Sequence, residues 1–167
     1  MPQLPWDASA LVKRFYTETG SDTVNALFTF TPALQMASTY ISYAETASIL
    51  RRRFNRGDIT LVAFNAVRNA LANEVLHSAD VSLMSVDDTA VLAGIALSDA
   101  YNINSSDAAI LAVFLRYARS LPPTDPACVL VASDQRLLRA AAAEGLTILN
   151  PELLAVADVA AFLASLA

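Results

Sequence analysis

Three aspartates in this sequence stand where an extended or apolar run turns into a helical one. Asp7 lies in WDASALVKRF (residues 6–15), Asp134 in VLVASDQRLLRAA (129–141) and Asp107 in NINSSDAAILAVFL (102–115). In an open α/β sheet, ligands bind beyond the carboxyl ends of the strands, so acids at such junctions can be metal ligands. Each also has a simpler explanation. Asp7 and Asp134 suit the start of a helix, and Asp107 suits the third position of a helix capped by Asn104.

Glu45 differs from the aspartates because it lies within a helical pattern. In STYISYAETASILRRRF (38–54) the residues three and four positions on are Ser48 and Ile49, so Glu45 lacks the basic partner that surface glutamates often have. It lies at the margin of an apolar stripe, which consists of Tyr40, Tyr43, Ala47, Leu50 and Phe54. The default interpretation is that the side chain of Glu45 is exposed to solvent. A side chain that points inward is the better interpretation only if the aspartates lie beside it.

Four such acids in one place would favour a divalent cation. Carboxylates brought together without a counter-ion repel one another and are driven towards protonation. A hard cation removes this penalty, and an all-oxygen donor set suits Mg²⁺ or Mn²⁺. Zinc is not expected, because the chain has one histidine, His77, and one cysteine, Cys128, at unrelated positions.

The elements that must position these acids alternate along the chain as short β-like runs and longer helical patterns. We predict strands at residues 3–6, 34–37, 81–86, 129–132 and 146–149. Helices are predicted at 8–16, 21–28, 39–54, 59–78, 89–101, 105–120 and 135–143, with a helical tail after Pro151. Gly57 and Asp58 separate two helices of a hairpin, Gly145 ends a helix, and the Pro-rich segment 121–126 is a connection.

This βαβ alternation predicts an α/β fold in three α/β/α layers, with a mostly parallel central sheet of about five strands. At 167 residues the chain is expected to be one domain, residues 1–167. Pro2 and Pro5 flank the first strand, and proline is poorly tolerated in a central strand. That strand must therefore be short, or Pro5 must lie at a bulge.

Composition and charge narrow the classes of protein that fit. Hydrophobic residues make up 55% and charged residues 16%, which excludes a disordered chain, and no apolar run is long enough for a membrane span. Without a secretion signal, and with a lone thiol, a cytoplasmic location is expected. The net charge of −5 disfavours a nucleic-acid partner, but the basic residues gather in one part of the chain and could form a local basic surface. They are Lys13, Arg14, Arg51, Arg52, Arg53, Arg56 and Arg68.

Taken together, WDASALVKRF, the Glu45 helix, SSDAAILA and VLVASDQRLLRAA resemble the PIN domain family, specifically the VapC-type toxin ribonucleases of bacterial toxin–antitoxin pairs. The resemblance covers about residues 6–150 and implies a ribonuclease that depends on Mg²⁺ or Mn²⁺. By position, the acidic quartet of the family corresponds to Asp7, Glu45, Asp107 and Asp134. Its hydroxyl residues correspond to Ser9 and Ser133. The third motif, NSSDAAILA, departs from the family because no tyrosine or histidine precedes its aspartate.

The resemblance implies roles that the structure can be compared with. Asp7, Glu45 and Asp107 would be the main metal ligands, and Asp134 would act through water or on a second ion. Ser9 and Ser133 would hold waters or a phosphate oxygen behind the ligands. The RNA backbone would be contacted by Arg14, Arg51 and Arg52, although a solvated helix end explains the two consecutive arginines equally well. Asp87 and Asp88 match no catalytic position and are interpreted as helix-capping residues.

Partners and rival functions follow from the same residues. Apolar residues in the segment 59–78, with a surface of Tyr43, Leu50 and Phe54, predict a homodimer, and the resemblance adds an antitoxin partner. These apolar residues could instead complete the core of a helical hairpin.

A phosphatase with a nucleophilic aspartate is disfavoured, because Ser9 stands where a second aspartate is needed. The main alternative is a catalytically inactive PIN-like module that binds RNA or a protein.

Overall fold

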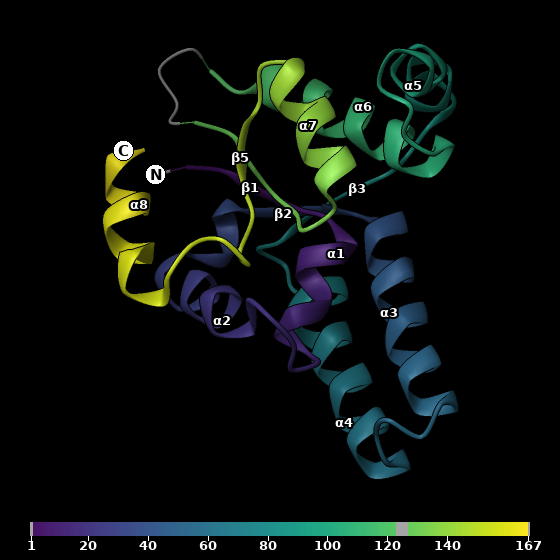
Figure 1. Ribbon diagram of the computed structural model, residues 1–167, viewed down its shortest axis with the longest axis vertical. Coiled ribbons are helices and arrows are strands. Elements are labelled where there is room, and N and C mark those ends of the chain that lie inside the picture. The colour runs from purple at the N-terminus through teal and green to yellow at the C-terminus, as the bar shows by residue number, and fades with distance from the viewer. Residues whose placement is uncertain (1, 123–126, 167) are drawn as a thin grey trace.

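In the computed structural model, which describes residues 2–122 and 127–166, five strands form one sheet in which every pairing is parallel (Figure 1). The order across the sheet is β3-β2-β1-β4-β5, so the first strand lies at the centre. The strands are β1 (Leu4–Trp6), β2 (Met36–Thr39), β3 (Ser82–Met84), β4 (Val129–Val131) and β5 (Thr147–Leu149). The predicted connection at 121–126 lies largely outside the described residues.

Helices precede or follow every strand. They are α1 (Ala8–Leu11), α2 (Ser21–Phe30), α3 (Tyr40–Asn55), α4 (Leu61–Leu71), α5 (Asp88–Tyr101), α6 (Ser105–Ser120), α7 (Gln135–Ala143) and α8 (Val159–Ser165). The turns Val12–Arg14, Ala33–Gln35 and Val156–Asp158 are 3₁₀, and Ala72–Leu76 is a π turn at the end of α4. The hairpin of α3 and α4 extends away from the sheet (Figure 1).

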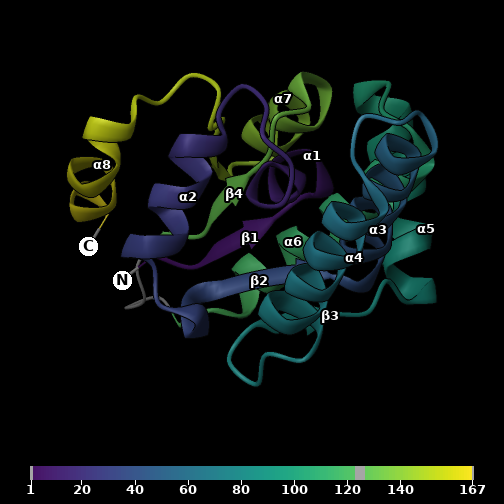
Figure 2. The same ribbon diagram turned by 90° about the horizontal axis from the view of Figure 1, so that it is seen from below.

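The core lies on both faces of the sheet because strand residues point alternately to opposite sides. In β4, Val129 and Val131 join a buried cluster with residues of α1, α2, α3 and α4, whereas Leu130 belongs to a second cluster with α6 and α7. Figure 1 shows α6 and α7 on one side of the strands and α2, α3 and α4 on the other, and Figure 2 views the molecule from the side of α3 and α4. The fold is therefore the predicted three-layer α/β/α arrangement. No helix of the described residues is long and apolar enough to cross a membrane.

Pro5 lies in a central strand, β1, which is short and whose hydrogen-bonded ladder with β4 is interrupted at the proline. β1 has only three residues, and it contacts β4 through Trp6 opposite Val131 and through an isolated bridge from Gln3 to Cys128. Pro5 lies between these two contacts and has no N–H to donate. The short strand expected from the proline is thus present.

Element boundaries differ from the predictions at several places, including the third strand, which was predicted at 81–86 and spans only Ser82–Met84. The second strand was predicted at 34–37 but begins at Met36, and Leu34 lies in a 3₁₀ turn with 70% of its surface exposed. Ser38 and Thr39 extend this strand because they pair with β1 and β3, and their hydroxyls are satisfied by the carbonyl of Trp6 and by the start of α3. The predicted helix 8–16 changes to 3₁₀ at residue 12, and the helix 59–78 ends in the π turn.

Leu50 and Lys13, which could have belonged to exposed surfaces, are both buried. Leu50 is fully buried and Phe54 stacks on Phe64 at 5.0 Å, so these residues fill the α3–α4 hairpin rather than forming an exposed patch. Lys13 is 4% exposed and therefore adds nothing to a basic surface. Its amine makes ion pairs with Glu18 at 2.9 Å and Glu152 at 2.8 Å. These pairs compensate the burial of its charge, a contact that no local pattern revealed.

Candidate active site

The four acids singled out in the sequence line one pocket of about 400 Å³. Asp7 follows β1 and Asp134 follows β4, and these strands are neighbours, with the N–H of Asp7 donating to the carbonyl of Val131 at 3.0 Å. Glu45 reaches the pocket from α3 and Asp107 from the first turn of α6. The remaining lining residues are Ala8, Ser9, Ser48, Ile49, Arg52 and Asn104.

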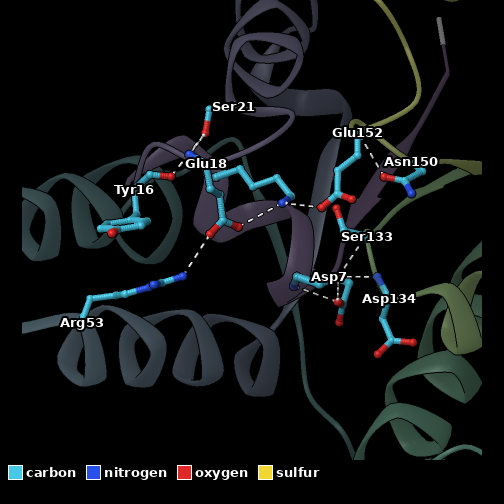
Figure 3. Close-up of polar contacts among 11 residues, drawn as sticks. Asp7, Tyr16, Glu18, Ser21, Arg53, Ser133, Asp134, Asn150 and Glu152 are labelled. Atoms are coloured by element: carbon cyan, nitrogen blue, oxygen red, sulfur yellow. Dashed lines mark hydrogen bonds and ion pairs between the residues drawn. The ribbon is translucent and has the colours of Figure 1, made fainter. Parts of the chain in front are cut away.

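Ser9 connects the ends of the two central strands. Its backbone N–H and its hydroxyl both donate to Oδ2 of Asp7, and the same hydroxyl oxygen accepts from the N–H groups of Ser133 at 2.9 Å and Asp134 at 3.2 Å. Figure 3 shows Asp7 beside Ser133 and Asp134. Ser9 thus holds a nearly buried carboxylate, that of Asp7 (5% exposed), in one place.

Ser133 contributes a backbone donor to the site, and the role of its hydroxyl stays a prediction. Its hydroxyl is buried and, within residues 2–122 and 127–166, has no hydrogen-bond partner. It does not line the pocket, and its contribution to the site is the backbone N–H that Ser9 accepts.

Asp134 is both a helix cap and a pocket residue. Its Oδ1 accepts from the N–H groups of Arg136 at 2.8 Å and Leu137 at 3.0 Å, which are free donors at the start of α7. Asp134 is therefore a helix cap, as one interpretation of the sequence proposed. This role does not exclude a role as a metal ligand, because the capped end of the helix opens into the pocket.

Asp107 and Glu45 are linked by uncharged side chains. Asn104 caps α6 by accepting from the N–H of Asp107 at 2.8 Å, and its Nδ2 donates to Oδ2 of Asp107 at 2.7 Å. The hydroxyl of Ser106 lies 3.4 Å from Oε1 of Glu45 and 3.0 Å from Oδ1 of Asn104. The sequence identified Asn104 as a cap, but its amide contact and the Ser106 bridge depend on which side chains α3 brings to α6.

The acids perturb one another electrostatically. Burial raises the pKa of Asp107 to about 6, with further increases from the charges of Asp7, Asp134 and Glu45, while Arg136 lowers it. Burial also raises the pKa of Glu45, and the charge of Asp7 adds to the effect. The pKa of Asp7 is raised mainly by burial, and its hydrogen bonds from Ser9 oppose this. Such mutual destabilisation of carboxylates is what a bound cation would relieve.

The donor chemistry of the pocket fits Mg²⁺ or Mn²⁺. All the candidate ligands are carboxylate oxygens, and no histidine or cysteine lines the pocket. As the side chains stand, however, no three Asp, Glu, His or Cys residues among those described are arranged to hold one ion. The carboxylates of Asp107 and Asp134 instead accept hydrogen bonds from neighbouring groups. The residue types in the pocket therefore fit Mg²⁺ or Mn²⁺.

Three solved structures share the fold over most of both chains. A toxin-antitoxin complex from Klebsiella pneumoniae is 16% identical, with a TM-score of 0.56 over 89% of this chain and 98% of that chain. The structure of FitAB bound to an IR36 DNA fragment is 11% identical, with a TM-score of 0.65 over 92% of this chain and 98% of that chain. The structure of PAE2754 from Pyrobaculum aerophilum is 18% identical, with a TM-score of 0.59 over 96% of each chain. No family model and no curated protein sequence matches the chain. The chain has a PIN-like fold.

Within this PIN-like fold, only one of the three arginines predicted to contact RNA lines the pocket. Arg52 does so from α3, and its charge lowers the pKa of Glu45. Arg51 instead packs over the ring of Phe64 at 4.5 Å, and Arg14 is paired with Glu74 at 2.9 Å. The predicted roles of these arginines, and those of the four acids, remain predictions.

Sequence reasoning missed the influence of Arg136 on the site and the ion-pair network of Lys13. Arg136, two positions after Asp134, is close enough to Asp107 to affect its pKa. Lys13 joins Glu18 and Glu152, and Glu18 in turn pairs with Arg53 of α3 at 3.3 Å (Figure 3). The sequence does show Arg136 two positions after Asp134, the residue that caps α7. The Lys13 network had no local signal, since Glu152 is 139 residues away.

Asp87 and Asp88 have the structural roles expected of them. Asp87 caps α5 through the N–H of Ala90 at 2.9 Å and pairs with Arg116 at 3.0 Å, and Asp88 is the first residue of that helix. Neither lines the acidic pocket.

Proposed function

We propose that this chain is a divalent-metal-dependent ribonuclease, the toxin of a toxin–antitoxin pair, in which residues 1–167 form one domain. The observation that carries the proposal is the convergence of four carboxylates in one pocket at the carboxyl edge of a parallel sheet with a PIN-like fold. Acids that raise one another's pKa are costly to keep together, and clusters of this kind are typical of functional sites.

In this proposal Asp7, Glu45 and Asp107 hold Mg²⁺ or Mn²⁺ directly. Asp134, whose Oδ1 is already used by two backbone N–H groups, acts through water or on a second ion. The bound ion supplies charge neutralisation at the phosphate and a water that is nucleophilic at neutral pH. Ser9 keeps the Asp7 carboxylate at the strand end.

The substrate proposed is RNA, held at the rim of the pocket by its phosphates. Arg52 is the basic residue among those that line the pocket, and it is exposed. No ion pair involving Arg52 exists within the described part of the chain. An unpaired guanidinium next to an acidic pocket can neutralise a phosphate of the RNA backbone and so hold the strand at the rim.

The proposed partners are an antitoxin and a second copy of the chain. One structure with this fold is a toxin-antitoxin complex. An antitoxin segment with a basic residue would complement the acids of the pocket. For the homodimer, the exposed apolar residues of the predicted segment 59–78 are Leu61 and Val62 on α4, which are 57% and 81% exposed. A toxin acting on RNA with an antitoxin would work in the cytoplasm.

An inactive PIN-like module that binds RNA or protein is the second candidate. It is favoured by the hydrogen bonds that already engage carboxylate oxygens of Asp107 and Asp134 in the described residues. A titration with Mn²⁺ separates the two, because a vestigial site has little affinity for the metal.

The direct test is cleavage of a mixed RNA pool by the purified full chain in Mg²⁺ and in EDTA. We expect cleavage only in Mg²⁺, and a loss on the order of 100-fold or more in Asp7→Asn and Asp107→Asn, since each removes one charge at nearly constant volume. Asp88→Asn, on the exposed first turn of α5, is the matched control and should keep the parental rate. Cleavage by the purified chain that persists in EDTA, or at the parental rate in both pocket variants, would contradict the proposal.

A further inference from the structure

Asn104 makes two separate contacts through the two ends of its side-chain amide. Its Oδ1 accepts from the N–H of Asp107 at 2.8 Å, which caps α6, and its Nδ2 donates to Oδ2 of Asp107 at 2.7 Å. A backbone N–H can only donate, so the oxygen of the amide must face it and the NH₂ group must face the carboxylate. The capping contact therefore determines that the amide NH₂ of Asn104 donates to the carboxylate of Asp107.

Capping alone does not require an amide at this position. Ser, Thr and Asp cap helices about as well as Asn, because only an acceptor oxygen is needed. The other long helices that carry a side-chain cap use such residues, namely Thr39, Thr60, Asp87 and Asp134. Among the side-chain caps of the described helices, Asn104 alone carries an amide NH₂ donor, and it lines the acidic pocket.

The donor of Asn104 restricts the Asp107 carboxylate. Oδ2 is held by the amide, and within the described residues Oδ1 accepts no hydrogen bond, so Oδ1 is the oxygen left for a cation. The hydroxyl of Ser106 extends the contact to Oε1 of Glu45. Since that hydroxyl has one hydrogen, it serves Asn104 and Glu45 in turn. Two uncharged side chains thus join carboxylates that belong to two helices, α3 and α6.

We propose that Asn104 is a positioning residue that orients the Asp107 carboxylate for a divalent cation through its Nδ2, independently of its capping of α6, with Ser106 placing Glu45. This inference rests on the proposed function. Groups that hydrogen-bond a metal-ligating carboxylate reduce the number of orientations that the ligand must give up on binding. Removing such a partner typically weakens metal binding about 10–100-fold.

The experiment compares the full chain with Asn104→Ser, which keeps a capping oxygen and removes the amide donor. The probe is Mn²⁺ alone, and free Mn²⁺ is measured by electron paramagnetic resonance, so no cleavage is needed. We expect Asn104→Ser to bind Mn²⁺ at least about 10-fold more weakly with an unchanged melting temperature. Asn104→Ala should lose both affinity and thermal stability. Asn69→Ser, which removes an exposed amide on α4 outside the pocket, should change neither.

Each outcome decides a different question. If Asn104→Ser binds Mn²⁺ as tightly as the parent, Asn104 is only a cap, and tighter binding would mean that its amide competes with the cation; both overturn the inference. If the parent itself does not bind Mn²⁺, the proposed function fails, and the inference fails with it. Should Asn104→Ser not fold, Asn104→Thr carries the same prediction, because threonine also caps without an amide.

Discussion

Replacing Asp107 with asparagine should make the metal-free protein more stable at neutral pH, although it removes a predicted metal ligand. The folded chain raises the pKa of this carboxyl from 3.8 to about 6, chiefly by burial and then through Asp7, Asp134 and Glu45. A raised pKa means that the folded state binds the proton more tightly than the unfolded state. The parent therefore loses stability as the pH rises from about 4 to about 6. Above that window the loss is complete, and asparagine avoids it because it does not ionise.

The size of the effect follows from competing terms. A rise of the pKa from 3.8 to about 6 corresponds to at most about 3 kcal/mol at about 1.4 kcal/mol per pKa unit. The side chain is only partly buried, so solvent screening reduces this figure substantially. The variant also loses the favourable charge at the N-terminus of α6, worth about 0.3–1 kcal/mol. We therefore expect a net gain of about 1 kcal/mol at pH 7.5, or about 2–4 °C in melting temperature, and no gain at pH 4.

Urea unfolding in EDTA at pH 4, 5, 6, 7 and 8 measures this difference directly. The control is Asp88→Asn, which removes an exposed acid outside the pocket and should show no gain that grows with pH. Added Mn²⁺ should then stabilise the parent more than Asp107→Asn, because only the parent keeps the full ligand set. The reasoning is refuted if Asp107→Asn is no more stable than the parent at pH 7.5, or if its gain is the same at pH 4.

Three further predictions concern the rest of the site and the surface. Ser9→Ala should lower the free energy of unfolding by about 1–3 kcal/mol, because two backbone N–H groups lose their acceptor, whereas Ser48→Ala in the same pocket should be neutral in urea unfolding. Arg52→Gln should reduce the slope of log affinity for RNA against log salt by about one, measured by fluorescence anisotropy in Ca²⁺, and an equal reduction in Arg56→Gln would argue against a specific contact. The chain should sediment as a dimer at micromolar concentration and Val62→Asp as a monomer; a monomeric parent at equilibrium would rule out the dimer.

Much of the fold follows from local patterns that the sequence carries openly. The apolar run 129–132 is buried on both sides, which is why it reads as a strand of a parallel sheet rather than as one face of a helix. Parallel strands end at the same edge of the sheet, so acids placed directly after β1 and β4 had to be neighbours once those strands paired. Caps such as Asn104 and Asp134 were also readable, because a cap depends only on residues two or three positions away.

Other features depended on contacts between distant residues. Ser38 and Thr39 belong to β2, although their polar side chains suggest a loop or cap, because β1 and β3 lie on both sides of that strand. The sequence alone did not determine whether Leu50 is exposed or buried. Leu50 is buried because it packs in the cluster that includes Phe64 of α4. The buried charge of Lys13 is met by Glu18 nearby in the sequence and by Glu152 from the opposite end of the chain.

The direction of Glu45 shows most clearly what the sequence alone determined and what it did not. Its position in mid-helix, without a basic partner, was readable from the residues around it. Whether it faces solvent or the other acids depends on the first turn of α6, where Ser106 meets it from 61 residues away. The period of a helix fixes which residues share a face, but the element that covers that face is chosen by the packing of the whole sheet and its two layers.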